Sequence, residues 1–221
     1  MAVQIDQGRE REQIMNAAYR CLIASEGASV SITDILQAAG LSTRAFYRHF
    51  ASKDSLLLAM FRRDSERVTA ELSAAAAGTL TAAEALRSWI DGALRLMSQE
   101  PRRRRALVLS SDEARRARGY AGEREWYHAT SEAALAAILR RGVEDGSFPW
   151  ANPEADAEQI QAILGYCLDT QLLRRPADGD ARLAERAGEL ADRVGDFIFR
   201  ALGAAPGPTP RADTGGGADP R

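Results

Sequence analysis

The strongest constraint on the fold of this chain is the spacing of its apolar residues, which recur three, four and seven positions apart. Ile14, Ala18 and Leu22 share one such face, as expected of an amphipathic helix. Alternating strand-like runs are scarce, and no proline precedes Pro101. Because proline interrupts helix interiors, its absence leaves this long segment free to be helical. The sequence therefore predicts an all-α fold.

Cap residues divide this pattern into separate helices. Ser31, Ser42 and Ser52 precede apolar runs, and a hydroxyl at that position accepts a hydrogen bond from a free N–H group of the first turn. Gly27 and Gly40 follow apolar runs, which is typical of helix C-termini. We expect helices over 9–26, from 31, from 42 to about 48, from 52, and over 81–98, 101–118, 122–141, 154–174 and 180–202.

Composition and missing motifs exclude several classes of protein. The 221 residues carry a net charge of −2, so the chain as a whole is not a basic nucleic-acid binder. Two isolated cysteines, no apolar stretch of membrane length and no secretory signal predict a cytoplasmic protein. The GxSxG, HExxH, P-loop and GxGxxG motifs are absent from the sequence. We therefore expect no enzyme activity, no cofactor and no metal site.

The stretch LSTRAFYRHF, residues 41–50, is basic and aromatic, and no acidic residue lies between Asp34 and Asp54. Two short helices joined by a turn at Gly40 have the spacing of a helix-turn-helix, here residues 31–50. On a helical wheel, the apolar residues face inward and four polar ones face outward: Thr43, Arg44, Tyr47 and Arg48. Hydroxyl, guanidinium and phenol groups suit base edges and phosphates. The pattern predicts a surface that meets DNA.

The run SITDILQAAGLSTRAFYRHFASK, Ser31 to Lys53, resembles the DNA-binding signature of the TetR family of transcriptional regulators. The matching positions are Ile35, Gly40, Ser42, Phe46, Tyr47, His49, Phe50, Ser52 and Lys53. The resemblance implies a flexible N-terminal arm (1–8) and a three-helix DNA-binding domain (9–53). A long fourth helix would join these to a larger helical ligand-binding and dimerisation domain (54–203). The Gly- and Pro-rich segment 204–221 is expected to be a disordered tail.

The same resemblance implies roles for individual residues of the motif. Base edges would be contacted by Thr43, Arg44 and Ala45. Phosphates would be contacted by Tyr47, His49 and Lys53, with Ser31 and Thr33 at or near the backbone. From the residues alone, a partly buried ring at Tyr47 and a solvated or helix-capping histidine at His49 remain open alternatives.

The last two predicted helices carry broad apolar stripes. These stripes are ordinary core of one chain, or they form a four-helix bundle between two chains; the resemblance favours a homodimer. The expected interface residues are Ile160, Ile163, Leu164, Cys167, Leu168, Leu190, Val194, Phe197 and Ile198.

A small-molecule site is expected among the central helices, since such sites are mostly apolar with a few polar anchors. The candidates are Trp89, Met97, Trp126, Tyr127, His128, Tyr166 and Asp169. The run Arg102 to Arg105 is open to two interpretations, a solvated helix face or a site for an anionic effector.

The expected function is therefore a sequence-specific regulator, a homodimeric repressor released from a palindromic double-stranded DNA operator by a small-molecule effector. Activation instead of repression stays open. The alternative is a small-molecule-binding helical protein whose helix-turn-helix no longer binds DNA.

Overall fold

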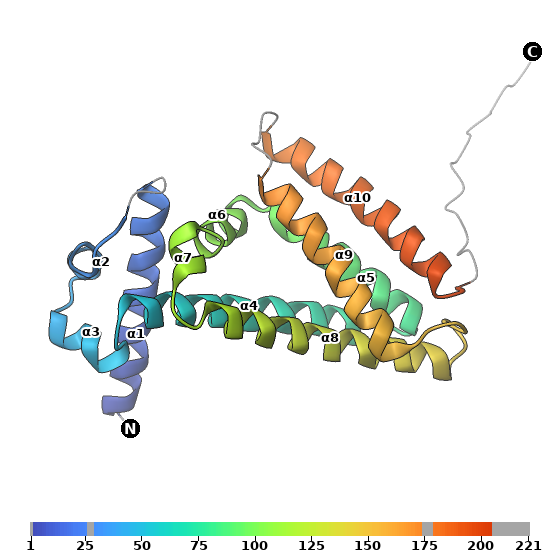
Figure 1. Ribbon diagram of the computed structural model, residues 1–221, viewed down its shortest axis with the longest axis horizontal. Helices are drawn as coiled ribbons and strands as arrows, with labels where there is room; N and C mark the ends of the chain where they lie inside the picture. The colour runs from blue at the N-terminus through green and yellow to red at the C-terminus, as the bar shows by residue number, and fades with distance from the viewer. Residues whose placement is uncertain (1, 26–28, 174–178, 205–221) are drawn as a thin grey trace, which may run out of the picture.

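The computed structural model of the chain describes residues 2–25, 29–173 and 179–204. All regular secondary structure within these ranges is helical, which confirms the all-α fold class. In order along the chain (Figure 1), the elements are α1 (Ala2–Ala24), α2 (Ile32–Ala39), α3 (Thr43–His49), α4 (Lys53–Ala77), α5 (Ala82–Arg95), the short 3₁₀ turn η1 (Leu96–Ser98), α6 (Glu100–Leu109), α7 (Asp112–Arg116), α8 (Tyr120–Glu144), α9 (Pro153–Leu173) and α10 (Gly179–Ala201).

Helices α2, α3 and α4 begin at the predicted capping serines Ser31, Ser42 and Ser52. Ser31 Oγ accepts a hydrogen bond from the Asp34 N–H at 3.1 Å, and Asp34 Oδ2 accepts one from the Ser31 N–H at 2.9 Å. This reciprocal pairing is a capping box, and a similar box precedes α5. At the end of α2, Gly40 has a φ of 65°. That left-handed conformation favours glycine, so Gly40 ends the helix as predicted.

Two segments differ from the expected helices. Residues 2–8, expected to form a flexible arm, continue α1 back to Ala2; the segment contains no proline, and a single Gly8 within a helix costs only about 1 kcal/mol. Residues 101–118, expected as one helix, form α6 and α7. The chain turns at Ser111, whose Oγ accepts a hydrogen bond from the Ala114 N–H at 3.3 Å and starts α7.

Gly142 lies inside α8 instead of ending it, because α8 continues to Glu144. The buried ring of Phe148 packs against this glycine so closely that an added Cβ would overlap the ring. Phe148 also meets Phe199 of α10 edge to face, with ring centroids 5.7 Å apart. The absence of a side chain at Gly142 therefore serves packing between α8 and the end of the chain.

Helices α1, α2 and α3 form a three-helix unit that packs on the first turns of α4 (Figure 1). Ile14, Phe46 and Leu56 belong to its core, and Val108 and Leu109 of α6 join the same core. The expected domain boundary after residue 53 therefore runs through a shared core. Apolar side chains from both sides of that boundary bury one another.

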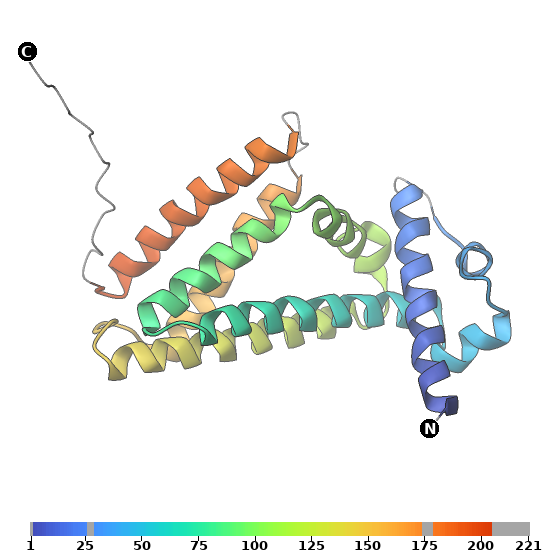
Figure 2. The same ribbon diagram turned by 180° about the vertical axis from the view of Figure 1, so that it is seen from behind.

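The other helices form a second, larger body. Figures 1 and 2 show α4 and α8 running together, with α5 and α9 crossing them and α10 lying along α5. Trp89, Leu86 and Leu135 are fully buried in its core. None of the described helices is long and apolar enough to span a membrane. Apart from Ala204, the expected disordered tail lies outside the described residues.

The packing of Phe148 predicts the effect of adding a methyl group. Gly142→Ala should lower the free energy of unfolding by roughly 1–3 kcal/mol, because the Cβ overlaps a fully buried ring. Gly122→Ala in the same helix meets open space and should be neutral or stabilising by about 1 kcal/mol at most. Urea unfolding of the three proteins measures both effects, and equal stability of the two variants would contradict the packing argument.

Candidate nucleic-acid interface and adjoining cavity

Helix α3 has one buried and one exposed face. Phe46 and Phe50 are buried in the core of the three-helix unit, with ring centroids 5.7 Å apart. Tyr47 packs edge-on against Phe46 at 5.4 Å, yet 59% of the tyrosine is exposed. The ring is therefore braced at its base while its hydroxyl reaches solvent. The alternative left open by the sequence, a partly buried Tyr47 ring, therefore applies only to the edge that contacts Phe46.

The residues expected at base edges divide between these two faces. Thr43 and Arg44 are exposed in the first turn of α3, next to the capping Ser42. Ala45 is only 4% exposed and belongs to the buried face, which does not support its expected contact with a base edge. A helix turns by about 100° per residue, which carries position 45 away from the face shared by 43, 44 and 47.

The start of α2 is exposed, but the hydroxyl of Ser31 is already hydrogen-bonded to Asp34. Ser31 Oγ donates to Asp34 Oδ2 at 2.7 Å while it accepts from the Asp34 N–H. The hydrogen bonds from Ser31 lower the pKa of the Asp34 carboxyl, which therefore stays charged beside this helix end. That charge disfavours a phosphate at Ser31. Thr33 is exposed and has no such constraint.

His49 does not reach the exposed face. Its side chain is 8% exposed and its Nε2 lies 3.0 Å from Glu10 Oε2 of α1. Arg48 Nη1 donates to the same oxygen at 2.8 Å. Hydrogen bonding by His49, together with the Arg48 charge, lowers the pKa of Glu10. This arrangement does not support the expected phosphate contact by His49, because the histidine ties α3 to α1.

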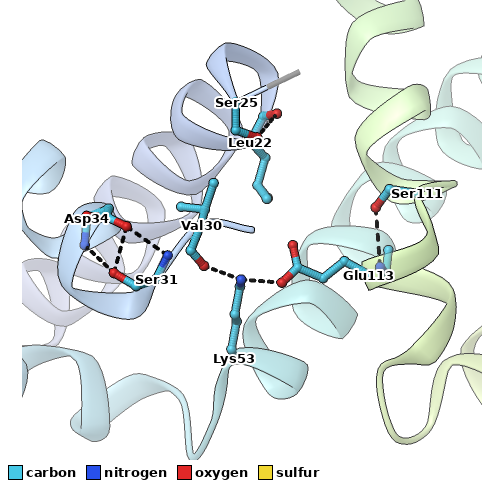
Figure 3. A network of polar contacts seen from close by, with 9 residues as sticks. Leu22, Ser25, Val30, Ser31, Asp34, Lys53, Ser111 and Glu113 are labelled. Atoms are coloured by element: carbon cyan, nitrogen blue, oxygen red, sulfur yellow. Dashed lines mark hydrogen bonds and ion pairs between the residues drawn. The ribbon is translucent and has the colours of Figure 1, made fainter. Parts of the chain in front are cut away.

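Lys53 is likewise committed within the protein (Figure 3). Its Nζ donates to the carbonyl oxygen of Val30, just before α2, and pairs with the carboxylate of Glu113 on α7. The lysine side chain is 19% exposed and the glutamate 33%. Lys53 therefore links the helix-turn-helix to α7 of the larger body, and its expected phosphate contact is not supported.

A cavity of about 450 Å³ lies between α4, η1 with α6, α8 and α9. Its wall is mostly apolar and carries a small number of charged and hydroxyl groups, as is usual for small-molecule sites. The lining residues are Phe61, Asp64, Ser65, Arg67, Val68, Leu96, Met97, Pro101, Arg102, Arg105, Ala106, Leu109, Ser110, Tyr127, Leu168, Asp169 and Leu172.

Three of the seven expected ligand residues line this cavity: Met97, Tyr127 and Asp169. The other four lie elsewhere. Trp89 is 1% exposed within the core, and Tyr166 is 72% exposed on α9. Trp126 is next to Tyr127 on α8 but turned away, under the Arg62 guanidinium at 3.6 Å.

His128, the fourth of these residues, pairs with Arg124 instead of lining the cavity, with Nη2 and Nε2 3.3 Å apart. Burial and the neighbouring Arg124 charge lower the pKa of His128. Among the aromatic candidates, Tyr127 lines the cavity, whereas Trp126 and His128 of the same helix do not.

The sequence did not identify a polar cluster that connects the cavity wall to α1. Asp64 and Arg105 line the cavity, and the Tyr19 hydroxyl donates to Asp64 Oδ2 at 2.9 Å. The Arg105 guanidinium lies 4.8 Å from the centroid of the Tyr19 ring. Burial and the Asp64 charge raise the pKa of Tyr19, so the phenol stays protonated. In the sequence, only the polar hydroxyl of Tyr19 among the apolar residues of α1 could have indicated this cluster.

The apolar stripes expected at a dimer interface are largely used within the chain. Ile160, Leu164 and Ile198 are at most 3% exposed in the core of the larger body. Partly buried Cys167, Leu190 and Val194 pack against that core, Ile163 is also partly buried, and Leu168 lines the cavity. Phe197 alone among the expected interface residues is largely exposed, at 55%. The buried residues are thus used within the chain, and the interface itself remains a prediction, for which Phe197 is the most accessible candidate.

The bridge in Figure 3 predicts an energetic coupling between the two bodies. Lys53→Ala and Glu113→Ala should each destabilise the chain, and the double variant should lose less than the sum of both. A coupling of about 1 kcal/mol is expected for a partly buried pair. Denaturant unfolding of the four proteins measures it. Strict additivity would show that the pair contributes nothing.

Comparison with known proteins agrees with this geometry. The model of the tetR family of bacterial regulatory proteins matches residues 14–60. The HTH-type transcriptional repressor Rv1474c of Mycobacterium tuberculosis is 28% identical over 193 residues, covering 86% of this chain and 93% of that protein.

Solved structures share the fold. GusR of Salmonella enterica superposes with a TM-score of 0.68 at 21% identity, over 89% of this chain and 96% of GusR. A TetR transcription regulator from Haloarcula marismortui has a TM-score of 0.68 at 22% identity, over 86% of this chain and 98% of that one. The match to the family model covers the capped α2–α3 motif and its core, and the fold agrees beyond it; residues 14–60 match the tetR family of bacterial regulatory proteins, and the chain as a whole is similar to regulators of that family.

Proposed function

We propose that this chain is a repressor that reads a DNA operator with the exposed face of α3 and leaves it when a small molecule fills the cavity. The observation that carries the proposal is the composition of that face. Thr43, Arg44, Tyr47 and Arg48 are exposed side by side, and no acidic residue occurs in α3. A surface of this kind suits a polyanion with readable base edges.

The position of each side chain supports a separate role for it. Thr43 and Arg44 lie in the first turn of α3, the end of a recognition helix that contacts base edges in the major groove. A guanidinium can bind guanine O6 and N7 together, so Arg44 supplies specificity. The exposed hydroxyl of Tyr47 and the Arg48 guanidinium, which Glu10 holds in place, bind phosphates and set the register.

A homodimer supplies the second recognition helix, since a palindromic operator mirrors a two-fold axis. On α9 and α10, Tyr166 and Phe197 expose large aromatic surfaces, at 72% and 55%. Exposed apolar side chains on neighbouring helices favour a contact between two copies of the chain. This interface is narrower than the full stripes, because most of their residues are buried within the protomer.

Repression is supported by the mycobacterial relative, which is named as a transcriptional repressor and matches along almost its whole length. Release requires that a ligand bind one conformation more tightly than another. Asp64 and Val68 of α4 line the cavity, while Leu56 of the same helix lies in the core of the three-helix unit. A shift of α4 on ligand binding would therefore change the spacing of the two recognition helices.

The DNA-binding proposal is tested by anisotropy titration of DNA fragments that flank the chain's own gene, followed by fragments selected from random DNA. Arg44→Ala should lower the affinity for a selected operator by about 1–3 kcal/mol and relax specificity at one position. Arg140→Ala, which removes an exposed arginine of α8, is the matched control and should bind like the unchanged protein.

Equal losses in both variants would show that only net charge matters and would sink the assignment of α3 as the reading helix. If no fragment were selected even from random DNA, the helix-turn-helix would be inactive. The small-molecule-binding protein without DNA affinity would then be the better account.

The dimer proposal predicts that Phe197→Glu shifts the protein toward monomer at micromolar concentration, because a charge cannot be buried there without a partner. Leu80→Glu is the matched control, since Leu80 is 94% exposed in the turn between α4 and α5. Sedimentation velocity distinguishes the two species. An unchanged dimer in the Phe197 variant would place the interface elsewhere.

A further inference from the structure

The four consecutive arginines of α6, Arg102 to Arg105, have different surroundings. Arg102 and Arg105, three positions apart, line the cavity. Arg104 turns to solvent and pairs with Glu100 at 2.6 Å. Arg103 is 6% exposed, and its Nη2 donates to the carbonyl oxygen of Leu172 on α9 at 3.3 Å. The arginine run is therefore neither a uniformly solvated face nor a single cluster, since two of its members reach the cavity.

The charged part of the cavity wall is dominated by guanidinium groups. Arg67, Arg102 and Arg105 face two carboxylates, those of Asp64 and Asp169. The Asp64 carboxylate is partly used, because its Oδ2 accepts the hydrogen bond from Tyr19. Asp169 is exposed at the edge of the wall. The remaining lining is apolar apart from hydroxyl groups, so a positive group is the main polar feature offered to an occupant.

Arg105 carries the inference furthest. Its side chain is only 33% exposed, and Arg105 Nη1 lies 3.5 Å from Asp64 Oδ1. Among the described residues this contact has no hydrogen-bond geometry, since Asp64 Oδ1 is buried without a hydrogen-bond partner. The other contact of the guanidinium is the face of Tyr19. A guanidinium has five donors, and an acidic group in the cavity would supply acceptors that the described neighbours of Arg105 do not.

Arg102 lies one turn before Arg105. Its Nη2 is bound to Glu71 Oε2 at 2.6 Å, a carboxylate that is outside the cavity lining. One nitrogen is thus held while the others stay close to the cavity, which keeps the guanidinium in place. Two guanidinium groups on one helix face can share the oxygens of a single acidic group.

We propose that the cavity takes an apolar organic molecule with one acidic headgroup, bound through its acid by Arg105 and Arg102. The regulatory meaning of this site rests on the proposed function, whereas binding itself does not. Ten of the seventeen lining residues are Phe, Val, Leu, Met, Pro, Ala or Tyr, and they surround the apolar part. The volume of about 450 Å³ lies in the usual range of about 300–1,000 Å³ for small-molecule sites.

The same arginine touches the DNA-binding unit, which gives the occupied site a route to α3. Arg105 lies over the ring of Tyr19, and the Tyr19 hydroxyl bonds to Asp64. Tyr19 is 3% exposed in the core that also holds Phe46 of α3. An acid that draws Arg105 away from Asp64 therefore changes the surroundings of a buried residue of α1.

Two fluorescent probes with one aromatic skeleton test the headgroup. Anilinonaphthalene sulfonate carries an anionic group, and N-phenylnaphthylamine lacks it. The unchanged chain should bind the sulfonate more tightly than the neutral probe. Arg102→Gln combined with Arg105→Gln should weaken the sulfonate about tenfold or more while it leaves the neutral probe nearly unchanged. Arg104→Gln is the matched control and should bind both probes as the unchanged chain does.

Equal losses for both probes in the double variant, or equal loss in Arg104→Gln, would overturn the proposal. A second measurement needs no variant, in case the double variant folds poorly. Decanoate, decanol and decylammonium compete with the neutral probe for the unchanged chain, and decanoate should displace it at about tenfold lower concentration. Best displacement by decylammonium would instead assign a cation site to Asp64, and equal displacement would leave an apolar pocket only.

These outcomes are separate from the test of DNA binding. A chain that binds no DNA but prefers the acidic probe loses its proposed function and keeps its ligand class. A chain that binds an operator and shows no preference for the acid loses only the ligand class.

Discussion

The continuity of α4 is the constraint on which the rest of the structure depends. Its first turns bury Leu56 and Met60 in the core of the three-helix unit, and its last turns bury Leu72 and Ala76 in the core of the larger body. Between them, the middle of the helix lines the cavity. Because an α-helix is hydrogen-bonded along its whole length, a displacement at one end is carried to the other. The three-helix unit that carries α3 and the cavity are thus joined by one continuous helix.

Polar contacts add to this connection in places where burial strengthens them. Lys53 bridges the start of the helix-turn-helix to Glu113 of α7, and Tyr19 bridges α1 to Asp64 of the cavity wall. Charge interactions in partly buried positions are stronger than in water, since less solvent screens them. Both bridges lie between the two bodies. They are suited to change together with the packing of α6 against α1.

Local features of the sequence predicted the local structure well. Serines before apolar runs predicted the starts of α2, α3 and α4, and Gly40 predicted the end of α2. The direction of Phe46 and Phe50 toward the core and of Arg44 and Tyr47 toward solvent followed from helical spacing alone. These predictions hold because capping and periodicity depend on residues within one or two turns of each other.

Predictions that needed a partner far along the chain were less successful. His49 and Lys53 looked like phosphate ligands, but Glu10 and Glu113 bind them inside the protein. Gly142 looked like a helix end, yet the ring of Phe148 needs its empty position. Ile160 and Ile198 looked like interface, although neighbouring helices of the same chain bury them. In each case, the residue type was interpreted correctly and its partner could not be known.

The sequence by itself determined that the chain is helical, where most of its helices begin, and which face of α3 is exposed. Those properties arise from hydrogen bonds and apolar spacing within a few residues. Only the tertiary structure decided which two of the four arginines in α6 reach the cavity, and that Asp64 connects this wall to Tyr19 of α1. The directions of side chains on separate helices depend on how those helices cross, and crossing is set by the packing of the whole core.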